Sequence, residues 1–383
     1  MNQVQLDYSD VLIRPRASGM TSRSEVSVQS SHSCLWARTP GGEAITINSI
    51  PIIAANMTGV GELEVAEALS NLGAMCVLKK WISAQQIISF FDVVDHEIRQ
   101  TRRDHVMMCV GTSDEDHMLF RSVYEQAPVK MLCIDVANGY LDRLVETVQM
   151  YRRLYPQLVI TAGNVCTSEQ TQTLLRAGAD IVKLGIGPGS VCTTRIETGV
   201  GRPQFSTVLD CAERAHAIGG LCIADGGCTT TGDVAKAFLA GADFVMLGGM
   251  FAGHKEGGGE IITRIFETGE YERLHDDGMN GEIPSRDTYS PIYRTEYFVR
   301  FYGSSSDAAR GEQSITPSSY SCSEGRDVEI PFRGWIHTTL ANILGGLRST
   351  CTYIGAPSIQ AISCSSTWYE VNATHNLLHE GGG

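Results

Sequence analysis

The chain has 383 residues, of which 43% are hydrophobic and 19% are charged, so its composition excludes a disordered, collagen-like or coiled-coil protein. Acidic residues outnumber basic ones by 43 to 30, and the net charge of −13 argues against a protein that binds nucleic acid or an anionic membrane. The length allows two average domains or one large α/β barrel.

Nothing in the sequence resembles a targeting or membrane-spanning segment. The stretch Met1–Arg16 lacks the apolar core of a signal peptide, and no apolar run reaches about 18 residues. The 12 cysteines are scattered, and no two are spaced as CxxC, which disfavours a structural zinc site. We therefore expect a cytoplasmic protein whose thiols are reduced and mostly buried.

Eight short, β-branched apolar runs recur along the chain, and each is near-continuously apolar rather than alternating. Strands that are buried on both faces have this pattern. The runs cover Ile50–Asn56, Ala74–Lys80, His105–Gly111, Lys130–Gly139, Gln157–Val165, Asp180–Gly187, Gly220–Gly227 and Ala242–Gly249.

Helical patterns lie between these runs, for example over Glu62–Gly73, Ser168–Ala179 and Thr230–Ala242. Eight strands alternating with helices predict a closed (β/α)8 TIM barrel, and an open doubly wound sheet is the alternative. After the eighth run the residues become polar and aromatic, which predicts an extended flap or lid insert over residues 257–334. Trp335–Thr350 then reads as a closing amphipathic helix.

The segment Lys183–Arg195, which reads KLGIGPGSVCTTR, is the most distinctive in the chain. Its G-x-G-x-G spacing is a weak match to a dinucleotide turn, and Pro188 and the lack of a following helix argue against one. The glycines instead allow main-chain groups to turn toward an ion or anion. Cys192, beside hydroxyls and Arg195, is a candidate nucleophile, although an inert thiol remains the alternative.

The seventh and eighth runs end in glycine pairs, Gly226-Gly227 and Gly248-Gly249. The loops after these strands bind phosphate in many barrels, because bare main-chain amides can approach its oxygens. Asp225 precedes the first pair, and its carboxylate suits a sugar diol better than a phosphate. Lys79 and Lys80 end the second run and either reach a bound anion or remain solvated.

Long motifs along nearly the whole chain resemble the IMP dehydrogenase/GMP reductase family. They are LDYSDVLIRP (Leu6–Pro15), CIDVANGY (Cys133–Tyr140), AGNV (Ala162–Val165), GIGPGSVCTTR, TGVGRPQ (Thr198–Gln204), IADGGCT (Ile223–Thr229), Gly232–Phe251 and Ile343–Ala356. DVANGY and SEGRDVEIPFRG (Ser323–Gly334) are similar to the reductase branch. No regulatory domain interrupts the barrel after its second strand, so we expect one catalytic domain over residues 1–383.

The resemblance implies reductive deamination of GMP to IMP and ammonia with NADPH. Cys192 would attack carbon 2 of the purine and form a covalent thioimidate, while Thr194 and Glu324 would assist the departure of ammonia. A thiolate makes the poor purine electrophile reactive in two steps, and the amino group needs a proton donor before it can leave.

The resemblance also implies the binding residues. Asp225 would hold the ribose, and the phosphate would lie among Ser190, Gly226, Gly227, Gly248 and Gly249, with Gly303, Ser304 and Ser305 nearby. The cofactor would meet Ser22, Arg23, Lys79, Asp135, Val136, Ala137, Gly187 and Pro188. Potassium would bind at Gly187, Gly189, Cys192 and Arg195. The family usually forms homotetramers.

The departures from the family pattern lie in the flap. Ser321 stands where the family usually has Arg, and Ser304 stands where it has Met. The stretch Phe266–Phe298 makes this region longer than in the family. Two alternatives therefore stay open, namely an IMP dehydrogenase without its regulatory domain and a catalytically inactive nucleotide-binding barrel.

Overall fold

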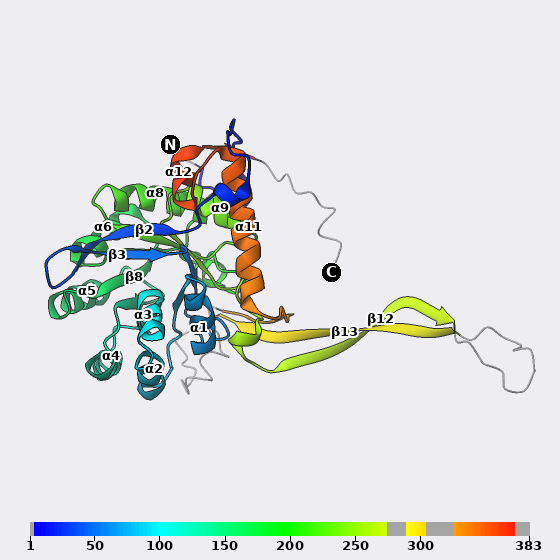
Figure 1. Ribbon diagram of the computed structural model, residues 1–383, viewed down its shortest axis with the longest axis horizontal. Coiled ribbons are helices and arrows are strands. Elements are labelled where there is room, and N and C mark those ends of the chain that lie inside the picture. The colour runs from blue at the N-terminus through cyan, green and yellow to red at the C-terminus, as the bar shows by residue number, and fades with distance from the viewer. Residues whose placement is uncertain (1–3, 274–288, 304–324, 372–383) are drawn as a thin grey trace, which may run out of the picture.

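Strands β4 to β11 close into an eight-stranded barrel in which neighbouring strands are parallel. The computed structural model describes residues 4–273, 289–303 and 325–371 (Figure 1). The barrel strands are β4 (Ile52–Ala54), β5 (Met75–Val77), β6 (Val106–Val110), β7 (Met131–Asp135), β8 (Val159–Val165), β9 (Ile181–Leu184), β10 (Leu221–Asp225) and β11 (Phe244–Leu247). Each lies within one of the eight predicted runs. Because β11 pairs with β4, the sheet is closed and the predicted (β/α)8 barrel is confirmed over the open sheet.

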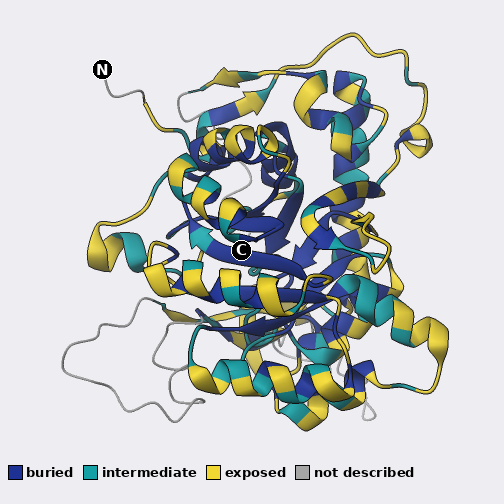
Figure 2. Cartoon of the chain, turned by 90° about the vertical axis from the view of Figure 1, so that its left-hand side faces the viewer, coloured by how far each residue is buried: buried dark blue, intermediate teal, exposed yellow. Residues whose placement is uncertain are grey.

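The barrel strands are buried on both faces, which explains why their sequences do not alternate. Every residue of β4, β5, β6, β9 and β11 is buried. Figure 2 shows the strands as a buried centre inside helices that are buried on one side and exposed on the other. Such helices need only one apolar stripe.

Helices follow the barrel strands and surround them. They are α1 (Leu63–Asn71), α2 (Ala84–Phe91), α3 (His96–His105), α4 (Asp114–Gln126), α5 (Asp142–Leu154), α6 (Ser168–Ala177), α7 (Thr194–Thr198), α8 (Gln204–His216) and α9 (Thr231–Leu239). Thr230 caps α9 by accepting the Asp233 N–H at 3.2 Å, which satisfies an amide that the first turn leaves without a partner. Among the described helices, none is long and apolar enough to cross a membrane.

Shorter elements complete the chain around the barrel. The hairpin of β2 (Ser30–Arg38) and β3 (Ala44–Ser49) lies at the end where the barrel strands begin, and β1 (Val11–Ile13) pairs with β15 (Trp368–Glu370). The predicted closing helix is α11 (Ile336–Ile354), and α12 (Ile362–Ser365) follows it. The 3-10 helices are η1 (Tyr8–Asp10), η2 (Arg23–Glu25), η3 (Lys255–Gly257) and η4 (Ile359–Ala361).

The insert after β11 forms a β-arm where the sequence predicted a flap or lid. Strands β12 (Ile261–Arg273), β13 (Tyr289–Tyr302) and β14 (Asp327–Pro331) build an antiparallel sheet, and β12 and β13 project away from the barrel (Figure 1). Paired residues share a face, so Thr263 with Tyr297 and Arg264 with Glu296 lie on opposite faces of the arm. Successive side chains of the arm thus alternate between its two faces, which distinguishes it from a structureless loop.

Candidate active site

A cavity of about 420 Å³ opens at the C-terminal ends of the barrel strands. Side chains from opposite sides of the barrel line it, including Asn56 after β4, Asp135 at the end of β7 and Asp225 at the end of β10. Strand ends converge on one mouth in a closed parallel barrel, which is why this face carries the chemistry of such folds.

The loop between β9 and α7 brings Cys192 into this cavity. The Cys192 N–H donates to the Gly189 carbonyl at 3.1 Å, and the Cys192 thiol donates to the Thr194 hydroxyl at 3.3 Å. The turn requires glycine at Gly185 (φ +140°), where a Cβ would lie 2.4 Å from the Asp225 carbonyl. The loop thus presents a half-exposed thiol beside a hydroxyl group.

The segment that begins with Gly325 is tied to the same loop. Gly325 forms a β-bridge with Cys192, and the Arg326 N–H donates to the Val191 carbonyl at 3.0 Å. The Arg326 guanidinium donates to the Ser190 carbonyl at 2.7 Å. The end of the flap sequence therefore lies beside the backbone of Ser190, Val191 and Cys192. Glu324, Ser304 and Ser305 lie outside the described residues.

The glycine pairs after β10 and β11 face the Cys192 loop at close range. A Cβ on Gly226 would lie 3.2 Å from the Gly189 nitrogen, and a Cβ on Gly249 would lie 3.1 Å from the Ser190 hydroxyl oxygen. Side chains at these positions would crowd the space between the loops. The bare backbone forms a cradle, which we call the glycine cradle, suited to the oxygens of a phosphate.

A buried cluster of charges lies below the cavity. The Lys183 ammonium is 2.8 Å from the Asp135 carboxylate and 3.0 Å from the Asp225 carboxylate. Burial alone would lower the pKa of Lys183, but the two carboxylates outweigh it and raise the pKa well above its usual value. Burial likewise opposes ionisation of Asp135, yet the charges of Lys183 and Lys80 lower its pKa to about 2. Lys183 and Asp135 are therefore both charged at neutral pH.

The two lysines after β5 have different partners. The Lys80 ammonium donates to the Asp135 carbonyl at 2.7 Å and lies 3.9 Å from its carboxylate. The Lys79 ammonium pairs with Glu62 at 2.8 Å. Both line the cavity, but only Lys80 contacts Asp135.

Comparison with known proteins identifies the kind of barrel. A model described as the IMP dehydrogenase / GMP reductase domain matches residues 5–382. The chain is 41% identical over 375 residues to a GMP reductase of Vibrio vulnificus and 41% identical over 376 residues to one of Klebsiella pneumoniae, with 98% of this chain and 97% of each relative covered. A Vibrio cholerae GMP reductase is 41% identical over 378 residues, which cover 98% of both chains.

The chain belongs to the IMP dehydrogenase/GMP reductase family. The predicted family is thus confirmed, as is the prediction of an oxidoreductase enzyme. Within this family barrel, most of the predicted site residues converge on the one cavity. They are Lys79, Asp135, Val136, Ala137, Gly187, Pro188, Gly189, Ser190, Cys192, Thr194, Asp225, Gly226, Gly227, Gly248, Gly249 and Gly303.

Of the predicted site residues that the structure describes, three do not line this cavity. Ser22 caps the 3-10 helix η2 by accepting the Ser24 N–H, and Arg23 begins that helix. The Arg195 guanidinium lies 3.2 Å from the Asp7 carboxylate. The main-chain carbonyl of Arg195 accepts the Gly199 N–H at 3.2 Å. The cofactor and potassium roles of these residues stay predictions.

Sequence reasoning missed Lys183, Asn56 and Asn164 in this family site. The Asn164 side chain donates to Asp225 at 2.8 Å, and the Lys183 ammonium donates to Asn56 at 3.3 Å. A signal existed for Lys183, because it is a lone cation inside the apolar run of β9 and buried cations need anionic partners. No local signal could have paired it with Asp135 and Asp225, which lie on two other strands.

Proposed function

We propose that the enzyme catalyses the NADPH-dependent reductive deamination of GMP to IMP and ammonia. The observation that carries this proposal is the half-exposed Cys192 thiol, 3.3 Å from Thr194, in a cavity that also contains the glycine cradle. The full-length similarity to proteins named GMP reductase favours this reaction over IMP oxidation.

The glycine cradle and Asp225 fit a purine nucleotide. The cradle would hold the phosphate through main-chain amides, and Asp225 would accept hydrogen bonds from the ribose hydroxyls. This placement would leave the purine beside Cys192. Because Cβ atoms at Gly226 and Gly249 would lie within about 3.2 Å of neighbouring atoms, the space is shaped for a ligand that approaches backbone closely.

The Cys192 thiolate would then form a bond to carbon 2 of the purine, and the carbon–nitrogen bond to the amino group would break. The departing nitrogen needs a proton, which Glu324 and the Thr194 hydroxyl would deliver. Gly325 next to Glu324 forms a bridge with Cys192, which supports this role. When bound, NADPH would supply the hydride that replaces the amino group at carbon 2, and the carbon–sulfur bond would then break, releasing IMP and the Cys192 thiolate. Asp135, Lys80 and Lys79 would hold the cofactor.

The same proposal includes a potassium ion bound at the Cys192 loop and assembly as a homotetramer, both of which the family resemblance implies. Main-chain carbonyls of Gly187, Gly189, Cys192 and Arg195 would coordinate the cation, and its charge would order the loop that carries the thiol. Gly187 supports a tightly folded loop, since its φ is +78° and a Cβ there would lie 2.5 Å from the Arg195 Cγ. Replacing potassium by a smaller cation in the assay tests this role.

The test is an assay of the purified protein with GMP and NADPH in potassium buffer, with the product identified by chromatography. We expect NADPH oxidation with formation of IMP and ammonia, and a loss of at least about a thousandfold in kcat for Cys192→Ala. Cys228→Ala is the matched control, because this second thiol lines the same cavity and burial raises its pKa above the usual range. It should retain activity.

The alternatives predict other outcomes of the same assay. Turnover of IMP with NAD, but not of GMP with NADPH, would make the enzyme a dehydrogenase. Binding of GMP without turnover in either direction would indicate an inactive nucleotide-binding barrel.

A further inference from the structure

Trp81 is an unusual residue on the rim of the cavity. Its φ is +74°, and among the described residues it alone combines a side chain with a positive φ. Its side chain is 62% exposed although it lines the cavity. A bulky residue in the left-handed region is a backbone outlier, and such outliers concentrate at ligand sites.

The position of Trp81 in the barrel separates it from the glycine cradle. It follows β5 and Lys80, and the Lys80 ammonium contacts Asp135 at the end of β7. In the closed barrel, β11 and β4 separate β10 from β5 on one side, and β9 and β8 separate β10 from β7 on the other. The wall formed by Trp81, Lys80 and Asp135 therefore lies across the mouth from Gly226.

This wall combines a flat aromatic surface with charged groups. If the phosphate and purine of GMP occupy the cradle and the Cys192 loop, the space beside Trp81 is left for a second molecule. An exposed indole gains most by stacking on a planar heteroaromatic ring, and its face also attracts a ring that carries positive charge. The oxidised nicotinamide ring meets both conditions, since it is aromatic and cationic. The reduced ring of NADPH is uncharged and not aromatic, but it is nearly flat and can still lie against the indole through dispersion contacts.

We propose that the Trp81 indole is the stacking surface for the nicotinamide ring of the cofactor. The proposal rests on the proposed function for the identity of the cofactor. It gives a functional reason for the positive φ of Trp81, a residue that lines the cavity. Lys80 and Asp135 form the charged edge of the same subsite.

Trp81→Leu tests the proposal by removing the ring while retaining an apolar side chain. We expect the KM for NADPH to rise roughly fivefold to tenfold, while the KM for GMP stays within twofold. Trp81→Phe should restore most of the affinity, because a smaller ring can still stack. Trp335→Leu is the matched control, since Trp335 is 51% exposed and lies outside the cavity lining, with its ring over the Lys255 ammonium.

A binding measurement separates this proposal from the proposed reaction. Titration of the protein with NADPH should quench tryptophan fluorescence, and the Trp81→Phe variant should lose most of that quenching while Trp335→Leu keeps it. The titration needs no turnover, so it decides the matter even if GMP is not a substrate. If Trp81→Leu does not fold, Trp81→Gly removes the ring at a φ that glycine adopts freely.

Two results would overturn the proposal. One is that the ringless variants bind NADPH as tightly as the wild type, or that the wild type does not bind NADPH at all. The other is a rise in the KM for GMP with an unchanged KM for NADPH, which would assign the indole to the substrate.

Discussion

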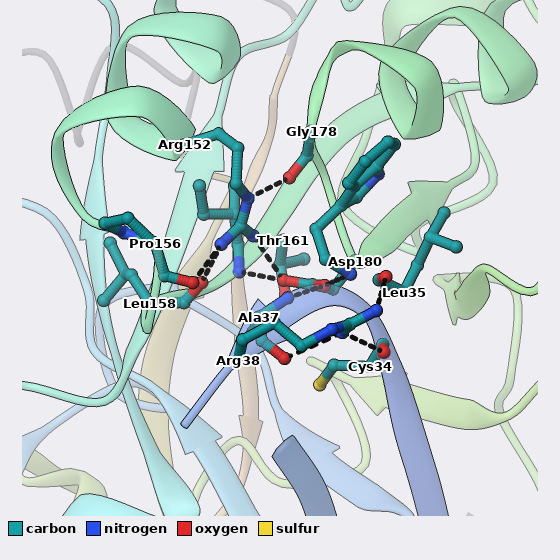
Figure 3. A network of polar contacts seen from close by, with 12 residues as sticks. Cys34, Leu35, Ala37, Arg38, Arg152, Pro156, Leu158, Thr161, Gly178 and Asp180 are labelled. Carbon is teal, nitrogen blue, oxygen red and sulfur yellow. Dashed lines mark hydrogen bonds and ion pairs between the residues drawn. The ribbon is translucent and has the colours of Figure 1, made fainter. Parts of the chain in front are cut away.

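Strand β9 joins two buried ion-pair networks that differ in purpose. Asp180, directly before β9, is fully buried and pairs with Arg152 at 2.6 Å. Its oxygens also accept the N–H groups of Trp36 (2.7 Å), Ala37 (2.9 Å) and Ile160 (3.0 Å) (Figure 3). Three residues further along, Lys183 pairs with Asp135 and Asp225 below the cavity. One network is sealed, and the other faces the candidate site.

The difference lies in what remains available for a ligand. The Arg152 guanidinium also donates to the carbonyls of Gly178, Pro156 and Leu158, so the sealed network is satisfied by the protein alone. The Asp135 side chain is 22% exposed and lines the cavity. Similar buried charges thus pair entirely within the protein at one end of the barrel and line the cavity at the other.

The largest effect on stability is expected at the sealed end. Asp180→Asn leaves the Arg152 guanidinium buried without an anion, and we expect unfolding free energy to fall by about 3–5 kcal/mol. The kcat of the folded variant should stay close to the wild-type value. Urea unfolding and steady-state kinetics measure the two quantities. Asp104→Asn, at a surface pair with Lys130, is the control. A large drop in kcat for Asp180→Asn would contradict the assigned structural role.

The reverse outcome is expected at the open end. Asp135→Asn removes the carboxylate between Lys183 and Lys80, and we expect kcat with GMP and NADPH to fall by about a hundredfold, because the proposed cofactor site would position the nicotinamide less accurately. The loss of unfolding free energy should be smaller than for Asp180→Asn, because the remaining amide is partly solvated. If both substitutions changed stability and kcat equally, the distinction between the two networks would fail.

Acid unfolding tests how much the charge of Asp135 contributes to stability at the open end of the barrel. The folded-state pKa of Asp135, about 2, lies below the unfolded value of about 4, because Lys183 and Lys80 overcome the effect of burial. Its charge therefore contributes stability that is fully present above about pH 4 and is lost as the pH falls toward 2. The contribution is on the order of 2 kcal/mol. Urea unfolding between pH 5 and pH 2 should show a shallower decline for Asp135→Asn than for the wild type.

The smallest effect is expected where an ion pair lies in solvent. On the β-arm, the Arg264 guanidinium donates to both Glu329 oxygens, at 2.8 and 2.6 Å, and both side chains are well exposed. Arg264→Ala should lower unfolding free energy by less than about 1 kcal/mol, and by still less in high salt. The kcat should not change. A larger loss of stability would mean that the arm is coupled to the barrel core.

The barrel was predictable because its signals are local. Each apolar run reports burial on both faces, and the eight runs match the eight strands that close the barrel. The β-arm was predicted less well, because it depends on pairing between two strands, in which Ile261 lies opposite Val299, Thr263 opposite Tyr297 and Ile265 opposite Thr295. Without knowledge of this pairing, the polar and aromatic composition of the insert predicted only a flap or lid.

The candidate site was predictable where glycines and a thiol gather in one loop, as around Cys192. It was not predictable for Lys183, whose meaning depends on carboxylates contributed by β7 and β10. The different partners of Lys79 and Lys80 likewise could not be predicted from the sequence, since adjacent residues at the end of a strand point in different directions.

The barrel could be predicted from the eight apolar runs along the chain, and the family from long motifs, among them GIGPGSVCTTR, the loop that carries Cys192. The charges that meet could be identified from the folded barrel alone, namely Asp180 with Arg152 at one end of β9 and Lys183 with two aspartates at the other. The reason is physical: the energy of a buried charge depends on neighbours in space and on the water excluded around them. Barrel closure brings those neighbours together from strands far apart in the chain.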